Sequence, residues 1–512
     1  MSKKLQIILI MTDTQRKDML GCYGNPDMLT PNLDKMAQKG IKFENAYCCQ
    51  PVCGPARSAM FTGTFPHSNG SWANTIPISL TTKTVGQRLS DEGIHTAYIG
   101  KWHLDGGDYF GSGKCPDGWD PNYWYDMRNY LEELTHEERL ESRRIRRNRS
   151  DDISVDFTFG HRCSNRAIEF IQQHYKEDFL LVVSYDEPHG PFLCPNEYYK
   201  KFEEYEFPKS PNVEDTLENK PEHQRVWAEW NLKMDRKKLK IKFPDFFGCN
   251  SFVDHEIGRV LDAIDKYSSE ALVIYTSDHG EMLQSHCLTN KGPAMYDEIT
   301  NIPFIVKCKG KIPENVTSDH LMSHIDITPT ILDYFNLNIS NVIEGKSMIP
   351  LLLSKILLES KSHSEADNDG INSEIFMEFG RYEIDHDSFG GFQLIRCIRD
   401  YRYKLVINIL SSDELYDLQE DPYEMHNLID SKQPLHQKIR NQLHDHLLNW
   451  MNETRDPFRG YYWEIRPWRE DARTPTWRNR GYTRQREEDE KYETRQLDYN
   501  TGLPMEKGTR KK

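Results

Sequence analysis

One short segment combines a thiol with a guanidinium. Cys53-Gly54-Pro55-Ala56-Arg57 places the two groups four positions apart at an expected loop-to-helix turn. A helix start favours negative charge, and Arg57 is close enough in sequence to hold an anionic nucleophile. For a cysteine considered alone, a small buried apolar residue is the ordinary interpretation. The role of the segment therefore depends on which other residues the fold brings to it.

Cations and imidazoles follow two segments that are expected to be buried strands. Lys101 and His103 come after residues 96–100, and His189 comes after residues 179–185. An ammonium group in such a place can neutralise an anion, and an imidazole can form hydrogen bonds or move a proton. The alternatives are a solvated strand end and a structural histidine.

Carboxylates at two other strand ends indicate a metal site. Asp13 ends the first expected strand, and Asp278 with His279 follows the strand expected at residues 271–276. Oxygen-rich sites of this kind suit calcium or magnesium, and a histidine is tolerated among the ligands. Each aspartate alone could equally be a helix cap or a turn residue.

The elements that position these residues alternate along the chain. Strands are expected at 5–11, 42–46, 96–100, 179–185 and 271–276, and helices at 31–39, 84–92, 164–174 and 252–266. This alternation predicts an α/β fold with a large, mostly parallel sheet that helices flank on both faces. Ligands of such sheets gather at the carboxyl ends of the strands, which is where the residues above lie.

The rest of the chain predicts a smaller second domain. Residues 1–358 are expected to form the catalytic domain, and residues 374–455 a small C-terminal α+β domain of antiparallel sheet plus helix. The tail, residues 456–512, is rich in Trp, Tyr and Arg. Such aromatics argue against pure disorder, so the tail is expected to pack on the body or on a neighbouring subunit.

Composition excludes some classes of protein. The net charge of -15 over 512 residues argues against a nucleic-acid binder. No apolar run is long enough to span a membrane, and the apolar first residues are better explained by a strand because no small-residue cleavage site follows them. The 11 cysteines lack zinc-type spacing. Most of them are expected to be free thiols in a reducing cytoplasm.

Several of these segments together resemble the sulfatase family. The pattern Cys-x-Pro-x-Arg at 53–57 resembles its maturation motif, and residues 93–104 resemble its second motif along their whole length. Framework motifs follow in the expected order at 323–330 and 414–418. The match covers roughly residues 5–428 in the alkaline-phosphatase-like superfamily. At whole-chain level the sequence is similar to uncharacterised cytoplasmic sulfatases of enteric bacteria.

The resemblance implies a nucleophile and a set of partners for it. In this family the cysteine is oxidised to formylglycine by a maturation enzyme. The hydrated aldehyde presents two hydroxyls, of which one attacks sulfur and the other later expels sulfate. The implied catalytic residues are Cys53, Arg57, Lys101, His103, His189 and Lys291. The implied ligands of one divalent metal ion are Asp13, Cys53, Asp278 and His279, with Ca²⁺ favoured and Mg²⁺ or Mn²⁺ as alternatives.

One departure keeps other functions open. Many sulfatases have adjacent aspartates at the first strand end, whereas this chain has Asp13-Thr14-Gln15. A neutral Thr14 weakens the case for tightly held calcium, and Gln15 is a weak candidate for the missing ligand. A phosphonate monoester or phosphodiester hydrolase of the same architecture is the nearest alternative. A non-catalytic protein that binds sulfated sugars is a distant one.

Residues near the expected pocket mouth suggest a sugar substrate. Aromatics and carboxylates there suit a carbohydrate, although each could also be ordinary packing or a solvated loop. The candidates are Trp102, Asp105 and His386 as substrate contacts, with Trp72, Tyr109 and residues 386–388 nearby. A cytoplasmic sulfatase would meet small sulfated saccharides rather than long polymers. The sugar, the metal and the oligomeric state, including a homo-oligomer, are left open.

Overall fold

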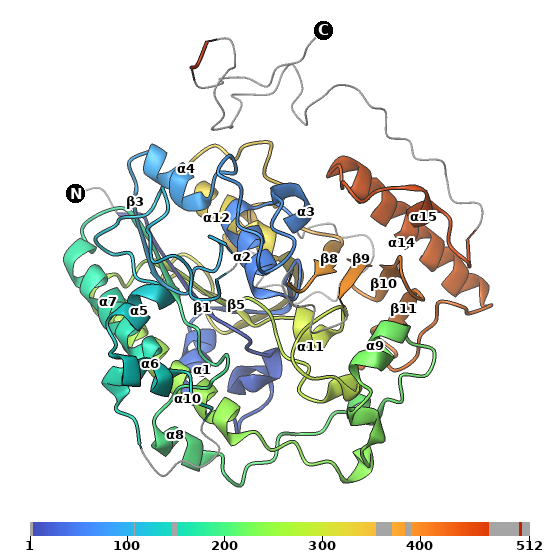
Figure 1. Cartoon of the computed structure of the whole chain (residues 1–512). Helices are drawn as coiled ribbons and strands as arrows, with labels where there is room; N and C mark the ends of the chain where they lie inside the picture. The colour runs from blue at the N-terminus through green and yellow to red at the C-terminus, as the bar shows by residue number, and fades with distance from the viewer. Residues whose placement is uncertain are drawn as a thin grey trace.

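The computed structural model of the protein describes residues 4–106, 108–145, 152–354, 371–383, 391–469 and 501–503. Its main sheet contains β1 (Gln6–Thr12), β2 (Ile41–Tyr47), β3 (His95–Gly100), β4 (Phe179–Ser184), β5 (Leu272–Ser277), β6 (Phe304–Lys307) and β7 (Val316–Ser323). These strands lie in the order β3-β4-β1-β5-β6-β2-β7, and β3, β1 and β5 are labelled in Figure 1. Of these seven, β6 alone runs antiparallel to its neighbours. The predicted mostly parallel sheet is confirmed.

Helices cover both faces of this sheet because both faces are apolar. Ile7 and Leu9 of β1 pack with α2 (Cys53–Thr62), α4 (Val85–Asp91) and α12 (Ile327–Tyr334). Ile8 and Ile10 point to the other face and pack with α1 (Pro31–Gln38), α7 (Phe159–His174) and α10 (Pro244–Tyr267). The strand is buried on both faces, as expected of a central parallel strand.

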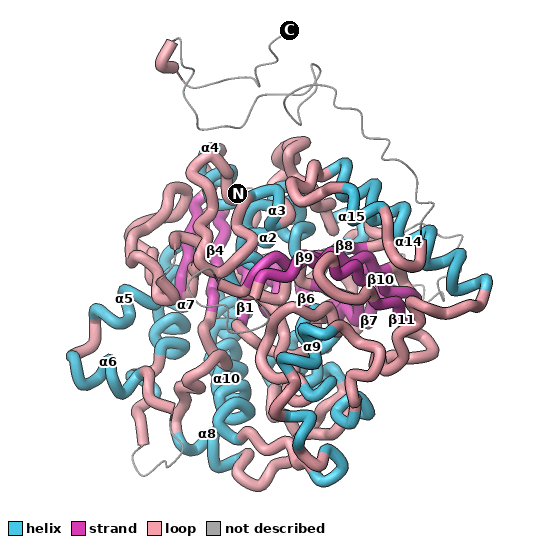
Figure 2. Tube along the Cα trace, turned by 45° about the vertical axis from the view of Figure 1, so that its right-hand side comes forward, coloured by secondary structure: helices cyan, strands magenta, loops and turns pink. Residues whose placement is uncertain are grey.

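A second, smaller sheet follows in the chain (Figure 2). Its strands are β8 (Ile375–Arg381), β9 (Phe392–Arg399), β10 (Tyr403–Asn408) and β11 (Glu414–Asp417), in the antiparallel order β11-β10-β9-β8. One face packs on the long helix α14 (Pro434–Glu453) through Leu405 and Leu447. The other face packs on the body through Phe379 and Tyr47. The predicted α+β character of this region is confirmed.

The first part of the tail lies against the small sheet. Asp456 pairs with Arg396 at 2.6 Å, and Arg466 pairs with Asp413 at 2.8 Å. Both arginines are buried, so these ion pairs hold residues 456–466 on the sheet. Most of the remaining tail lies outside the described residues.

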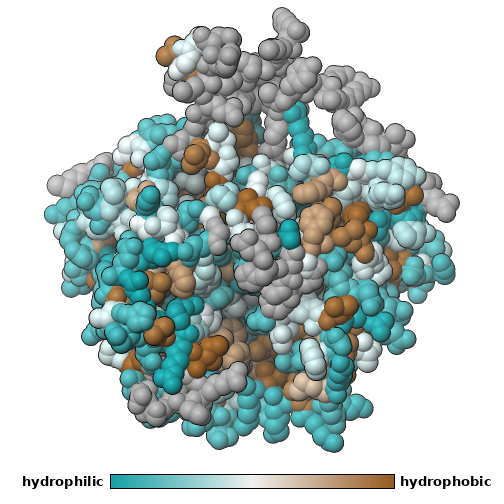
Figure 3. Space-filling model, viewed as in Figure 1, coloured by the Kyte–Doolittle hydropathy of each residue, from teal (hydrophilic) through white to brown (hydrophobic). Residues whose placement is uncertain are grey.

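The other α-helices are short. They are α3 (Pro66–Asn69), α5 (Met127–Glu132), α6 (His136–Ser142), α8 (Asn196–Lys201), α9 (Glu222–Trp227), α11 (Asp297–Thr300), α13 (Ile349–Leu352) and α15 (Tyr461–Glu464). No helix among the described residues has both the length and the apolar composition needed to cross a membrane. The face drawn in Figure 3 is largely hydrophilic, with hydrophobic residues in small separate patches.

Candidate active site

Cys53 is the first residue of α2 and is 1% exposed. Its Sγ lies 3.2 Å from Nε2 of His279 and 3.7 Å from Oδ1 of Asp13. The ammonium group of Lys291 donates to the same sulfur at 2.8 Å. The thiol therefore faces a carboxylate, an imidazole and a cation at once.

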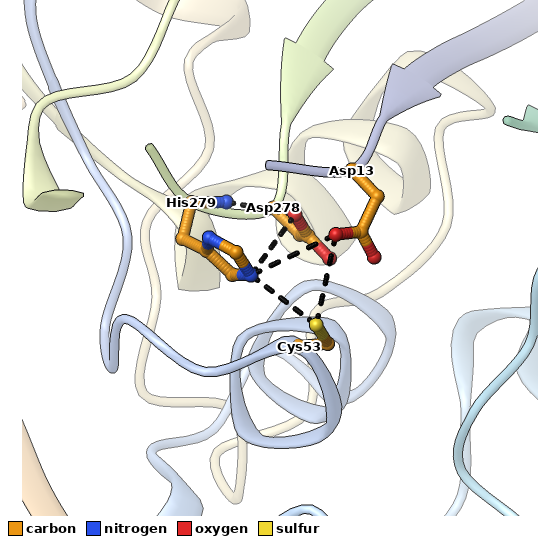
Figure 4. A group of neighbouring side chains, drawn as sticks. All are labelled: Asp13, Cys53, Asp278 and His279. Atoms are coloured by element: carbon orange, nitrogen blue, oxygen red, sulfur yellow. Dashed lines mark hydrogen bonds and ion pairs between the residues drawn. The ribbon is translucent and has the colours of Figure 1, made fainter. Parts of the chain in front are cut away.

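The strand order explains why these groups meet. β1 and β5 are parallel neighbours with Thr12 opposite Ser277, so Asp13 and Asp278 leave the sheet side by side. Together with Cys53 and His279 they place one ligand atom each within 4.8 Å of one another (Figure 4). All four side chains are buried. Two carboxylates, an imidazole and a sulfur suit a divalent ion, so the residues present fit the metal that the family resemblance implies.

Arg57 holds the two carboxylates in place. Its Nε donates to Oδ2 of Asp278 at 3.1 Å, and its Nη2 donates to Oδ2 of Asp13 at 3.2 Å. Nη1 donates to the carbonyl of Lys101 and to Oγ of Ser184. The hydrogen bonds of this guanidinium thus go to groups around the thiol, while the direct cationic contact with Sγ comes from Lys291.

Lys101 is fully buried and links Asp13 to a second group of residues. Its Nζ lies 2.7 Å from Oδ2 of Asp13 and 3.0 Å from Oδ1 of Asp186. It also donates to the hydroxyl of Tyr109 at 2.9 Å. That hydroxyl donates to Asp186 at 2.6 Å and lies 2.9 Å from Nδ1 of His189. The lysine therefore connects Asp13 with the side chains that surround His189.

The two histidines predicted to move protons, His103 and His189, have depressed pKa values. Burial, reinforced by Lys101 and Arg57, lowers the pKa of His103 to about 3. Burial and Lys101 lower the pKa of His189 to about 4. Both imidazoles are therefore neutral near pH 7, and Nδ1 of His103 has no hydrogen-bond partner among the described residues.

Charge in the buried cluster is balanced by its cations. Burial and Asp13 raise the pKa of the Cys53 thiol, but Lys291, Lys101 and His279 outweigh them and bring it to about 5. Burial also opposes ionisation of Asp13, yet Lys101 and other cations hold its pKa well below the usual value. Burial and Asp13 raise the pKa of Asp278 to about 6.

Thr14 and Gln15 differ in how they relate to this cluster. The Thr14 hydroxyl donates to Oδ1 of Asp13 at 2.6 Å, and its backbone N–H donates to Oδ1 of Asp278 at 3.2 Å. The side chain of Gln15 points to Asn250, to which its Nε2 donates at 2.6 Å. Thr14 therefore orients the carboxylates, while Gln15 is engaged elsewhere.

The expected substrate contacts occupy different environments. Trp102 is buried in the core with Phe61 and Tyr98, so packing accounts for it. Asp105 accepts a hydrogen bond from the backbone N–H of Ser112 at 2.7 Å. His386 lies outside the described residues.

Two residues beside the candidate site have no catalytic role in the prediction from the sequence. Asp186 comes soon after β4. An acidic residue that closely follows a buried strand can be recognised in the sequence, so Asp186 could have been predicted. Tyr382 directly follows β8 of the small sheet. Burial raises its pKa to about 12, and Lys291 and Cys53 are among the charges that act on it. No local pattern reveals that the small sheet reaches the site.

Comparisons with known proteins agree with this geometry. The sulfatase family model matches residues 6–337, and the model described as N-sulphoglucosamine sulphohydrolase, C-terminal, matches residues 286–453. Uncharacterized sulfatase YidJ of Escherichia coli K12 is 43% identical over 511 residues, or 98% of each chain. A structure solved with its substrate D-glucosamine-2-N,6-O-disulfate has a TM-score of 0.72 at 22% identity, covering 89% of this chain and 99% of its own. The phosphonate monoester hydrolase of Agrobacterium radiobacter has a TM-score of 0.69 at 21% identity, covering 88% and 96%.

Proposed function

The chain belongs to the sulfatase family, with the alkaline-phosphatase-like fold, and is a sulfuric ester hydrolase; from this premise we propose that it uses a formylglycine made from Cys53. The observation that carries the proposal is the position of Sγ, within 3.7 Å of a carboxylate, an imidazole and an ammonium group. The hydrated aldehyde would supply one hydroxyl to attack sulfur and a second to expel sulfate.

Asp13, Asp278 and His279 would hold one divalent ion together with residue 53, with Ca²⁺ favoured. Such an ion supplies charge stabilisation to an anionic substrate and favours the ionised form of a nearby hydroxyl. Arg57 contributes by keeping both carboxylates oriented, and Thr14 contributes a hydrogen bond to Asp13.

Lys101 and Lys291 would bind the sulfuryl oxygens. Both ammonium groups are buried, and fixed charges in a site that excludes water usually supply the largest catalytic effect. Lys291 already lies against residue 53 and His279 at 2.8 Å. It is therefore placed to contact a group bonded to the nucleophile.

His189 and His103 would move the protons. His103 is neutral, as a base must be, and would take a proton from the second hydroxyl. His189 would donate a proton to the leaving alcohol. An anionic substrate beside it favours the protonated imidazole, which offsets the depression of its pKa by burial and Lys101.

The substrate we propose is a small sulfated carbohydrate. The solved structure with a disulfated glucosamine supports this class, as do the aromatic residues Tyr109 and Tyr382 beside the site. Cleavage of a phosphonate monoester is the second candidate, because Thr14 replaces a carboxylate and a phosphonate monoester hydrolase shares the fold.

Mass spectrometry of the peptide that carries residue 53 tests the nucleophile. We expect the mass of the aldehyde and reaction with a hydrazide, together with release of sulfate from sulfated monosaccharides. Cys53→Ala should fold normally and release none. A free thiol in active protein would contradict the proposal, and a faster reaction with an aryl phosphonate ester than with an aryl sulfate would favour the second candidate.

A further inference from the structure

A second group of imidazole and carboxylate side chains lies at the amino edge of the main sheet, opposite the candidate active site. His95 is the first residue of β3, His174 is the last residue of α7, and Glu177 lies in the turn that leads to β4. Their ligand atoms lie within 4.8 Å of one another. At about 3.3 Å per strand residue, His95 is about 20 Å from Lys101 along β3.

The distances from the two imidazoles to Glu177 match those between ligands around one ion. Nδ1 of His95 and Nδ1 of His174 lie 3.2 Å and 3.1 Å from the same Oε2 of Glu177. Zinc binds nitrogen and oxygen ligands at about 2.0–2.2 Å, which puts tetrahedral ligand atoms about 3.3 Å apart.

The other ring nitrogen of His174 is already occupied. Its Nε2 lies 2.7 Å from the hydroxyl of Tyr123, which itself donates to Oε1 of Gln173 at 2.6 Å. The Tyr123 oxygen must therefore accept from His174. A neutral His174 then carries its proton on Nε2 and turns the lone pair of Nδ1 toward Glu177.

His95 shows the same arrangement. Its Nε2 lies 2.8 Å from Oδ2 of Asp120. Because a carboxylate oxygen accepts the hydrogen bond, His95 must carry a proton on Nε2. Without a cation, the Nδ1 lone pairs of two neutral imidazoles would face the Glu177 carboxylate, with ring centroids only 4.5 Å apart. A single divalent ion among the three groups satisfies both lone pairs and the carboxylate. A carboxylate behind a metal-bound histidine is a recurrent feature of zinc sites.

We propose that His95, His174 and Glu177 bind a zinc-type transition-metal ion that is separate from the catalytic one. Two imidazoles select zinc over calcium or magnesium. The side chains are 21%, 18% and 50% exposed, so the fourth position is open to water. The ion ties the end of α7 to the start of β3 and stabilises the fold.

Zinc titration by calorimetry, after removal of bound metal with a chelator, tests the site. We expect the wild type to bind one more equivalent of Zn²⁺ than His174→Ala or Glu177→Gln, and a large excess of Ca²⁺ should not displace it. Asp120→Asn should keep the equivalent with about 10–100-fold weaker affinity. Zinc bound at the catalytic centre is common to all variants and cancels in the comparison.

His446→Ala is the matched control, because His446 pairs with Glu374 at 2.7 Å and belongs to neither metal-ligating group. It should bind zinc as the wild type does. Equal stoichiometry and affinity in wild type, His174→Ala and Glu177→Gln would overturn the proposal. Glu177 is half exposed, so its variant remains informative if His174→Ala does not fold.

Discussion

The two edges of the main sheet carry charged clusters in different surroundings. At the carboxyl edge, the side chains of Asp13, Arg57 and Asp278 are 0% exposed. At the amino edge, Asp120 and Glu177 are 20% and 50% exposed. Removing one partner from a buried charge pair leaves the other uncompensated, whereas water screens an exposed one. Removing one charged group should therefore strongly destabilise its partners at the carboxyl edge and have little effect on them at the amino edge.

The largest expected effect comes from Arg57→Met. It leaves Asp13 and Asp278 without their shared guanidinium, so the free energy of unfolding should fall by about 3–5 kcal/mol. Arg162→Met is the control, because Arg162 pairs with the partly exposed Glu133 at 2.7 Å and its loss should cost less than about 1 kcal/mol. Urea unfolding measures the free energy of unfolding of both variants. Equal decreases in the two variants would contradict the expected difference between buried and exposed ion pairs.

The next effect is on catalysis. Lys291→Met removes the ammonium group beside Cys53 and should lower kcat by about 10²–10³-fold. Lys307→Met is the control, since Lys307 is also largely buried but pairs with Asp265 at 2.8 Å, away from the site. The rate of sulfate release measures kcat. If kcat falls as much in Lys307→Met as in Lys291→Met, Lys291 has no specific role in catalysis.

Local patterns predicted the central strands and the residues at their ends. β1, β3, β4 and β5 are largely apolar runs, so their ends could be placed within a residue or two. β6 was missed because it has only four residues and runs against its neighbours. α10 begins at Pro244 rather than at 252, and its first turn includes Phe246, which packs against the distant Phe192. No local pattern reveals that contact.

The sequence predicts those residues of the candidate site that directly follow strands of the main sheet. It does not predict residues that reach the site from a distant part of the chain. Asp13 and Asp278 meet because parallel neighbours end together. Tyr382 arrives from the small sheet, and the role of Thr14 as a donor to Asp13 depends on its backbone, whose φ is 62°. Long-range packing and an uncommon backbone conformation leave no signature in sequence spacing.

A smaller effect is expected from Thr14→Val, which keeps the shape but loses the hydrogen bond to Asp13. Affinity for Ca²⁺ should fall by about 10–100-fold, as when other outer partners of metal ligands are removed. Thr96→Val makes the same change in β3, where the hydroxyl donates to the Gly118 carbonyl at 2.6 Å, and should leave Ca²⁺ affinity unchanged. Calorimetry that finds equal affinity in Thr14→Val and wild type would contradict the orienting role.

The smallest effect is expected from Glu177→Gln in metal-free protein. The carboxylate is half exposed, so its loss should change the free energy of unfolding by less than about 1 kcal/mol. Free Zn²⁺ at about 100 times its Kd should stabilise the wild type by about 2.7 kcal/mol and the variant much less. Because any zinc at the catalytic centre acts on both proteins, the difference between them reports the amino edge alone. The difference in the free energy of unfolding between wild type and Glu177→Gln should therefore grow when zinc is added. If it does not grow, the residues at the amino edge are an ordinary surface cluster and only the buried edge binds metal.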